Sequence, residues 1–264
     1  MAFFDCHFFS DVLGLSVSAY VLLPQKTNRQ IGLPGGETKG AYPTLFLLHG
    51  LSDDHTVWMR RTSIERYAAA KNIAVVMPAV GRSFYQNMAS GPRYWTFLSE
   101  ELPTICRTFF PLSAAREDNF AAGLSMGGYG ALRLALTRPE GFAAAASLSG
   151  ALDLNKRLSE IGRPGSRFSR EEWAGIFGSA SKADGTDADL YTVAQKVAAA
   201  KSTHPRLFVA CGTEDELIEE NRGFHRHLES VHYEHTYEEG PGKHEWRYWD
   251  AQIEQVLAWL PLRR

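Results

Sequence analysis

The stretch that decides the fold reads Asn119-Phe120-Ala121-Ala122-Gly123-Leu124-Ser125-Met126-Gly127-Gly128. It begins as an apolar strand, and a helix is expected from about 127 to 137, ending before Pro139. Gly123 to Gly127 matches the G-x-S-x-G pattern of a nucleophile elbow, a strained turn that lifts the Ser125 hydroxyl above the sheet edge. Glycines suit a turn where strand and helix pack closely. The alternative is a glycine-rich turn with an idle serine, but the position between strand and helix favours the elbow.

On both sides of the elbow, short apolar runs alternate with helical patterns. This order is typical of a mostly parallel sheet with helices on both faces. Residues 4–10 and 14–23 follow each other across a short break, as an antiparallel hairpin at the sheet edge would. Further strands are expected at 44–48, 73–77, 206–211 and 233–238, helices at about 61–71, 217–230 and 246–260, and a polar loop at 27–42. A helical pattern over 96–110 is expected to kink or break at Pro103.

A serine hydroxyl needs a base, and the base needs an acid to orient it. In a fold with a nucleophile elbow, the chain order is serine, acid, histidine. The strand at 206–211 ends in Gly212-Thr213-Glu214-Asp215-Glu216, so it delivers acids to the carboxyl end of the sheet. Glu214, Asp215 and Glu216 are the candidates, and Asp215 is preferred partly because of the family resemblance given below. Asp215 could instead cap the helix that begins near Glu216.

Nine histidines compete for the role of base. His225 and His227 lie within the expected helix 217–230, and His232 and His235 flank or occupy the last strand. His244 is in a glycine-rich loop between that strand and the final helix, from which it can reach over the sheet edge. The other interpretation of such a loop histidine is a solvated side chain.

The negative charge that forms on an attacked carbonyl needs backbone donors after the nucleophile and after the third strand. Met126 and Leu51 occupy these positions, so we expect their N–H groups to form an oxyanion hole. His49 and Gly50 precede Leu51, with Gly50 allowing a close approach, although His49-Gly50 could be a plain strand-ending turn.

Composition limits the partners. The 264 residues are 44% hydrophobic and 22% charged, with a net charge of −2, which is ordinary for one α/β domain and lacks the basic surface that nucleic acid or anionic lipid requires. No nucleic-acid or membrane partner is expected. The oligomeric state stays open, and a homo-oligomer is possible.

The first ten residues do not resemble a signal peptide, and no stretch has the length of a membrane span. Cys6, Cys106 and Cys211 are too far apart for a metal-binding pattern. A cytoplasmic protein without a metal site is expected.

Several motifs together resemble one family, the compact bacterial α/β-hydrolase esterases that include tributyrin esterases, S-formylglutathione hydrolases (esterase D-like) and, more distantly, the antigen 85 mycolyltransferases. The resemblance covers most of the chain and rests on Leu47-Leu48-His49-Gly50-Leu51, Trp58, Ser83-Phe84-Tyr85, Glu101-Leu102-Pro103, Gly123 to Ala131, Ser149-Gly150, Gly212-Thr213-Glu214-Asp215 and His244-Glu245-Trp246. It implies an α/β-hydrolase fold, an acyl-enzyme mechanism on small esters or thioesters, the triad Ser125, Asp215 and His244, an oxyanion hole from Leu51 and Met126, and no organic cofactor.

Residues 151–200 are longer than a simple strand-to-helix connection and are interpreted as a small cap inserted into a single domain, 1–264. Its size predicts a preference for short acyl chains. The residues expected to bind substrate, for which ordinary core packing is the alternative, are His49, Gly50, Trp58, Trp95, Trp173, Ile176 and Phe177.

Four functions are compatible with this sequence. A serine carboxylesterase is favoured. An S-formylglutathione hydrolase is the main alternative, because ester and thioester attack pass through the same oxyanion. A non-catalytic binding module and an acyltransferase are less favoured, the first because a serine, an acid and a histidine are all present. Cinnamoyl and acetyl-sugar esters also stay open as substrates.

Overall fold

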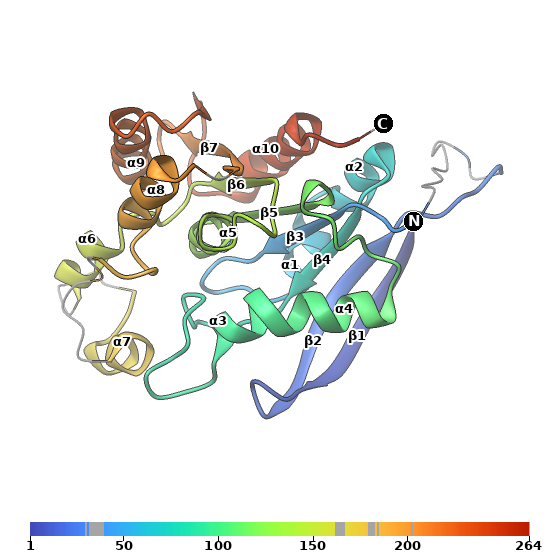
Figure 1. Cartoon of the computed structure of the whole chain (residues 1–264), viewed down its shortest axis with the longest axis horizontal. Coiled ribbons are helices and arrows are strands. Elements are labelled where there is room, and N and C mark those ends of the chain that lie inside the picture. The colour runs from blue at the N-terminus through green and yellow to red at the C-terminus, as the bar shows by residue number, and fades with distance from the viewer. Residues whose placement is uncertain are drawn as a thin grey trace.

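The protein is built on one eight-stranded sheet, seen in a computed structural model that describes residues 1–29, 31, 40–161, 167–178, 183, 185–201 and 203–263 (Figure 1). The strand order is β1-β2-β4-β3-β5-β6-β7-β8. The strands are β1 (Ala2–Ser10), β2 (Leu15–Leu23), β3 (Thr44–Leu48), β4 (Ala74–Pro78), β5 (Asn119–Leu124), β6 (Ala144–Leu148), β7 (Arg206–Gly212) and β8 (His235–Gly240). In the described part of the chain, every helix is too short or too polar to span a bilayer.

The predicted edge hairpin is present. β1 pairs antiparallel with β2, β2 pairs antiparallel with β4, and all the remaining neighbours in the sheet are parallel. The carboxyl ends of β3, β5, β6, β7 and β8 therefore meet at one edge. β6 is the strand that the sequence patterns did not identify, because its residues Ala144 to Leu148 are mostly alanine, which has a low strand propensity.

Helices cover both faces of the sheet, as predicted. Side chains of β3 alternate between two cores, with Phe46 and Leu48 in one and Leu45 and Leu47 in the other. The first core is completed by α4 (Leu102–Phe109), α5 (Met126–Thr137), α8 (Leu190–Ala199) and α9 (Ile218–Ser230), and the second by α1 (Val57–Arg61), α2 (Ile64–Lys71) and α10 (Trp246–Trp259). The helix predicted at about 61–71 corresponds to α2, and the short helix α1 lies just before it.

The helix expected over 96–110 does not stop at Pro103, but its hydrogen-bonding pattern changes directly before this residue. Helical backbone runs on from α3 (Tyr94–Thr96) through a π-helical turn, Phe97–Glu101, into α4. Pro103 lies at the start of α4, directly after the wider π turn, which accommodates a residue without an N–H donor.

The stretch interpreted as a cap contains α6 (Leu154–Glu160), α7 (Arg170–Phe177) and α8. Figure 1 shows these three helices grouped on one side of the molecule, next to α5 and α9. Residues 162–166, 179–182 and 184 of the stretch lie outside the described residues, as do 30 and 32–39 of the predicted loop 27–42.

Candidate functional site

Ser125 is the single residue that connects β5 to α5, and the chain turns sharply there. Its backbone has φ 53° and ψ −118°, a left-handed conformation that costs energy for a residue with a side chain. A Cβ on Gly123 would run into the carbonyl of Gly127, and a Cβ on Gly127 would run into the carbonyl of Leu48. The two glycines let strand and helix come close enough for the backbone to turn through Ser125.

The structure brings Ser125, His244 and Asp215 together from three distant parts of the chain. Nε2 of His244 lies 3.0 Å from Oγ of Ser125, and Nδ1 lies 2.9 Å from Oδ2 and 3.1 Å from Oδ1 of Asp215. A carboxylate can only accept, so Nδ1 carries the proton and Nε2 is free to take one from the serine hydroxyl. These are the contacts that nucleophilic catalysis by a serine requires.

Two loops hold His244 and Asp215 in register. Thr213 N–H donates to Gly240 O at 2.8 Å and Glu214 N–H donates to Gly242 O at 3.0 Å, so the loops after β7 and β8 continue the pairing of the strands. Gly242 has φ 153° and packs against Gly212, where a Cβ would collide with the Gly242 carbonyl. The acid and the histidine are therefore set by adjoining backbones.

The Asp215 side chain has no exposed surface, whereas that of His244 keeps 16%. Burial alone would raise the pKa of Asp215, but hydrogen bonds from His244, from Leu217 N–H at 2.8 Å and from Ser149 outweigh it and hold the pKa below its usual value. The carboxylate is therefore ionised at neutral pH and stabilises a proton on the imidazole. Of the alternatives in the sequence, Glu216 pairs with Arg167, and the backbone N–H of Glu214 donates to Gly242 O.

The loop after β3 carries the expected oxyanion donor Leu51. His49 is fully buried; its Nδ1 donates to Gly50 O at 2.7 Å and its Nε2 accepts from Val80 N–H at 3.1 Å. Tyr85 donates to His49 O at 2.8 Å. Burial lowers the pKa of His49 to about 4, so the ring is neutral and acts as a support for the loop.

Two cavities meet at Ser125. One has a volume of about 340 Å³ and the other about 460 Å³, and both are lined by Leu51, Ser125, Arg167, Glu216 and His244. Arg167 and Glu216 form an ion pair at 2.6 Å, so this pair lies where the two cavities adjoin. Met126 lines the first cavity together with Leu51, which places both expected oxyanion residues in the wall next to the serine.

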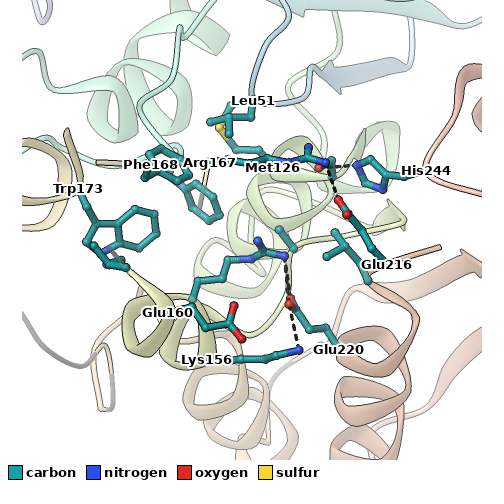
Figure 2. Close-up of a pocket in the computed structure, with 16 residues that line it drawn as sticks. Leu51, Met126, Lys156, Glu160, Arg167, Phe168, Trp173, Glu216, Glu220 and His244 are labelled. Atoms are coloured by element: carbon teal, nitrogen blue, oxygen red, sulfur yellow. Dashed lines mark hydrogen bonds and ion pairs between the residues drawn. The ribbon is translucent and has the colours of Figure 1, made fainter. Parts of the chain in front are cut away.

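The first cavity has an aromatic side and a charged side. Figure 2 shows Phe168 and Trp173 at one end, His244 and Glu216 at the other, and Lys156, Glu160 and Glu220 along a third side. Glu220 is nearly buried and pairs with Arg157 at 3.0 Å and with Lys156 at 3.7 Å, so the charges at this side largely compensate one another.

Of the seven residues predicted to bind substrate, Trp173 lines the first cavity and Gly50 the second. The other five do not line either cavity and pack behind the residues that do. Trp58 is fully buried, and its indole N–H donates to Leu48 O at 3.0 Å. The guanidinium carbon of Arg133 lies over the ring of Trp95, 3.9 Å from the ring centroid. Ile176 is in the core, and Phe177 packs on Trp173 with ring centroids 4.4 Å apart.

Sequence patterns missed much of the actual lining, namely Phe84, Lys156, Arg157, Arg167, Phe168, Glu216 and Leu217. Phe84 has φ 51° in the turn after β4, and its ring contacts Trp173 with centroids 5.7 Å apart. The motif Ser83-Phe84-Tyr85 in the family resemblance was the one available signal for this position.

Comparison with known proteins agrees with this geometry. A family model described as "Putative esterase" matches residues 20–260. An acetyl esterase of Caldicellulosiruptor saccharolyticus is 30% identical over 98% of both chains. The solved structure of FphF, a fluorophosphonate-binding serine hydrolase of Staphylococcus aureus, is 35% identical with a TM-score of 0.88 over 99% of both chains. An S-formylglutathione hydrolase (FrmB) from Staphylococcus aureus is 35% identical with a TM-score of 0.84 over 98% of both chains.

Proposed function

The chain belongs to the "Putative esterase" family, and on that premise we propose that it is a serine carboxylesterase that hydrolyses short-chain acyl esters with Ser125, His244 and Asp215 as its catalytic residues. One observation carries the proposal: Oγ of Ser125, the ring of His244 and the Asp215 carboxylate form an unbroken hydrogen-bonded series at the wall of a cavity. The likeness to an acetyl esterase and to a fluorophosphonate-binding serine hydrolase supports it.

In this mechanism Ser125 Oγ attacks the ester carbonyl carbon while His244 Nε2 takes the hydroxyl proton. The charge on the carbonyl oxygen is stabilised by the N–H groups of Leu51 and Met126, the latter at the N-terminus of α5. The tetrahedral intermediate then expels the alcohol, which receives the proton from Nε2. Water repeats the sequence on the acyl-enzyme and releases the acid. Asp215 stabilises the imidazolium in both halves of the reaction.

Acyl-chain length is set, in this proposal, by the aromatic end of the first cavity. Phe84, Phe168 and Trp173 close that end, and a cavity of about 340 Å³ suits a short acyl group. α6 and α7, which supply Lys156, Arg157 and Trp173, act as the cap of a single domain.

Thioester hydrolysis is the second candidate. The charged side of the cavity, with Lys156, Arg157 and Glu160, favours a polar leaving group over a long alkyl chain. The likeness to an S-formylglutathione hydrolase points the same way. We propose a cytoplasmic location for either activity, supported by the free thiols of Cys6, Cys106 and Cys211.

The test is a panel of p-nitrophenyl esters from acetate to palmitate, with S-formylglutathione alongside, run on the parent and on Ser125→Ala. We expect the alanine variant to lose about 10⁶-fold in kcat, the effect of removing a serine nucleophile. Turnover of S-formylglutathione well above that of the acetate ester would favour the thioesterase. Full activity in Ser125→Ala would contradict both, and a flat rate profile along the ester series would contradict the short-chain preference.

A further inference from the structure

Asp215 has a third hydrogen-bond donor that its triad role does not explain. Besides His244 and Leu217 N–H, the hydroxyl of Ser149, the residue that follows β6, interacts with its carboxylate and contributes to its lowered pKa. Ser149 is fully buried and has φ 49°, so a side chain is kept here in a conformation that glycine would adopt more cheaply. A strained, buried serine in contact with the triad calls for a functional explanation.

The direction of the Ser149 hydroxyl is fixed from its other side. Nε1 of Trp249, on α10, lies 3.1 Å from Ser149 Oγ. An indole N–H can only donate, so Oγ must accept from it, which leaves the hydroxyl proton for the Asp215 carboxylate or the buried Cys211 sulfur. Burial raises the pKa of Cys211 to about 12, so Cys211 stays a neutral thiol and a weak acceptor, and the ionised carboxylate is the favoured partner. The same tryptophan packs edge-on against His244, with ring centroids 4.8 Å apart. Trp249 therefore contacts the triad twice, through Ser149 and through the imidazole.

We propose that Ser149 and Trp249 are positioning residues for the triad: the indole fixes the hydroxyl, and the hydroxyl holds the Asp215 carboxylate where it receives His244. The hydrogen bonds then run in one series from Trp249 through Ser149, Asp215 and His244 to Ser125. Polarisation along such a series strengthens each bond. The inference rests on the proposed function, because it concerns the same reaction.

The first variant is Ser149→Gly, which removes the hydroxyl and also relieves the left-handed backbone. We expect kcat on p-nitrophenyl acetate to fall about tenfold, as for the loss of one hydrogen bond to a charged group, while KM stays within about twofold. Relief of the left-handed backbone offsets part of the cost of leaving the buried Trp249 N–H without its acceptor, so the melting temperature should fall by no more than a few degrees. A fall in kcat at a temperature where the variant is fully folded separates positioning from a merely structural role.

The second variant, Trp249→Phe, keeps a ring against His244 and removes the N–H donor. We expect a loss of about threefold to fivefold in kcat in the parent background, the size of one neutral hydrogen bond, and none in the Ser149→Gly background, because the indole acts through the hydroxyl. The proton NMR signal of His244 Nδ1–H should shift in both single variants. The matched control is Trp259→Phe, on the same helix, whose Nε1 donates to Thr236 Oγ1 at 3.1 Å; it should keep the parent kcat.

Three results would overturn the proposal: a Ser149→Gly enzyme with full kcat, losses that multiply in the double variant, or an equal loss in Trp259→Phe. Each is distinct from a failure of the proposed function. That failure would show as a parent without ester or thioester hydrolysis, or as activity that survives Ser125→Ala.

Discussion

His49 holds the carbonyl of Gly50, its own neighbour, through a 2.7 Å bond from Nδ1. That carbonyl belongs to the same peptide unit as the N–H of Leu51, and a trans peptide points the two in opposite directions. Asp53 N–H also donates to Gly50 O, at 3.3 Å. Fixing the carbonyl therefore aims the Leu51 N–H, the donor that we assign to the oxyanion hole.

This relationship distinguishes two substitutions of His49. An asparagine amide can replace Nδ1 and still donate to Gly50 O, whereas a glutamine amide reaches the position of Nε2 near Val80. We expect His49→Gln to lower kcat by about 10²-fold, close to the loss of one oxyanion donor, and His49→Asn to stay within about tenfold of the parent. Steady-state kinetics on p-nitrophenyl acetate provide the measurement. Equal losses in the two variants, in proportion to their melting temperatures, would argue for a purely structural role.

His49 should also make stability depend on pH. Burial lowers its pKa in the folded protein to about 4 from an ordinary value of 6.5. Between these values the unfolded chain binds one more proton than the folded chain, so the free energy of unfolding falls as the pH is lowered from 6.5 toward 4. The loss at this residue amounts to about 3 kcal/mol. Urea unfolding at several pH values should show a shallower dependence in His49→Gln, and identical slopes would refute the assignment.

Gly127 is expected to tolerate no side chain. A Cβ there would collide with the carbonyls of Leu48 and His49, which are backbone atoms that cannot move aside singly. We expect Gly127→Ala to lose about 3 kcal/mol or more of unfolding free energy, or to fail to fold. Gly175, within α7, has open space around its Cβ position, and Gly175→Ala should be neutral or up to about 1 kcal/mol more stable. Thermal unfolding of both variants makes the comparison.

Trp173 should limit the acyl chain. Removing its ring enlarges the aromatic end of the first cavity, so Trp173→Ala should raise the ratio of kcat/KM for the octanoate ester to that for the acetate ester by about tenfold, since each buried methylene is worth about 0.8 kcal/mol. Ile176→Ala is the control, because Ile176 is equally buried on the same helix but does not line the cavity. The same shift in both variants would show that loosened packing, not cavity length, changed the preference.

Local patterns predicted the parts of the fold that local physics controls. The strands β3, β5 and β7 are short apolar runs bounded by turn residues, and the elbow has two glycines at fixed spacing. His244 was selected because a glycine-rich loop between the last strand and the last helix can reach the sheet edge. The order of the strands, with β4 between β2 and β3, was not predicted from these local patterns.

The cavity wall could not be predicted in this way, because it depends on contacts between distant residues. Trp58 and Trp95 are aromatic residues near the site in sequence, but their rings point into the core. Arg167 meets Glu216 across 49 positions of the chain, and Trp249 meets Ser149 across 100. No periodicity encodes such pairs, and the left-handed backbone of Ser149 has no signature in its residue type.

Two serines, Ser125 and Ser149, occupy left-handed backbone that glycine would adopt with less strain, and both touch the same hydrogen-bonded series. A directed-evolution screen that rewards heat resistance alone is therefore expected to accumulate glycine at position 125 and to return sturdier, inactive proteins, whereas at position 149 the hydrogen bond to Trp249 opposes the exchange. Selection for turnover must be applied in every round to keep Ser125, so thermal robustness and catalytic competence are opposing traits at that place in the chain.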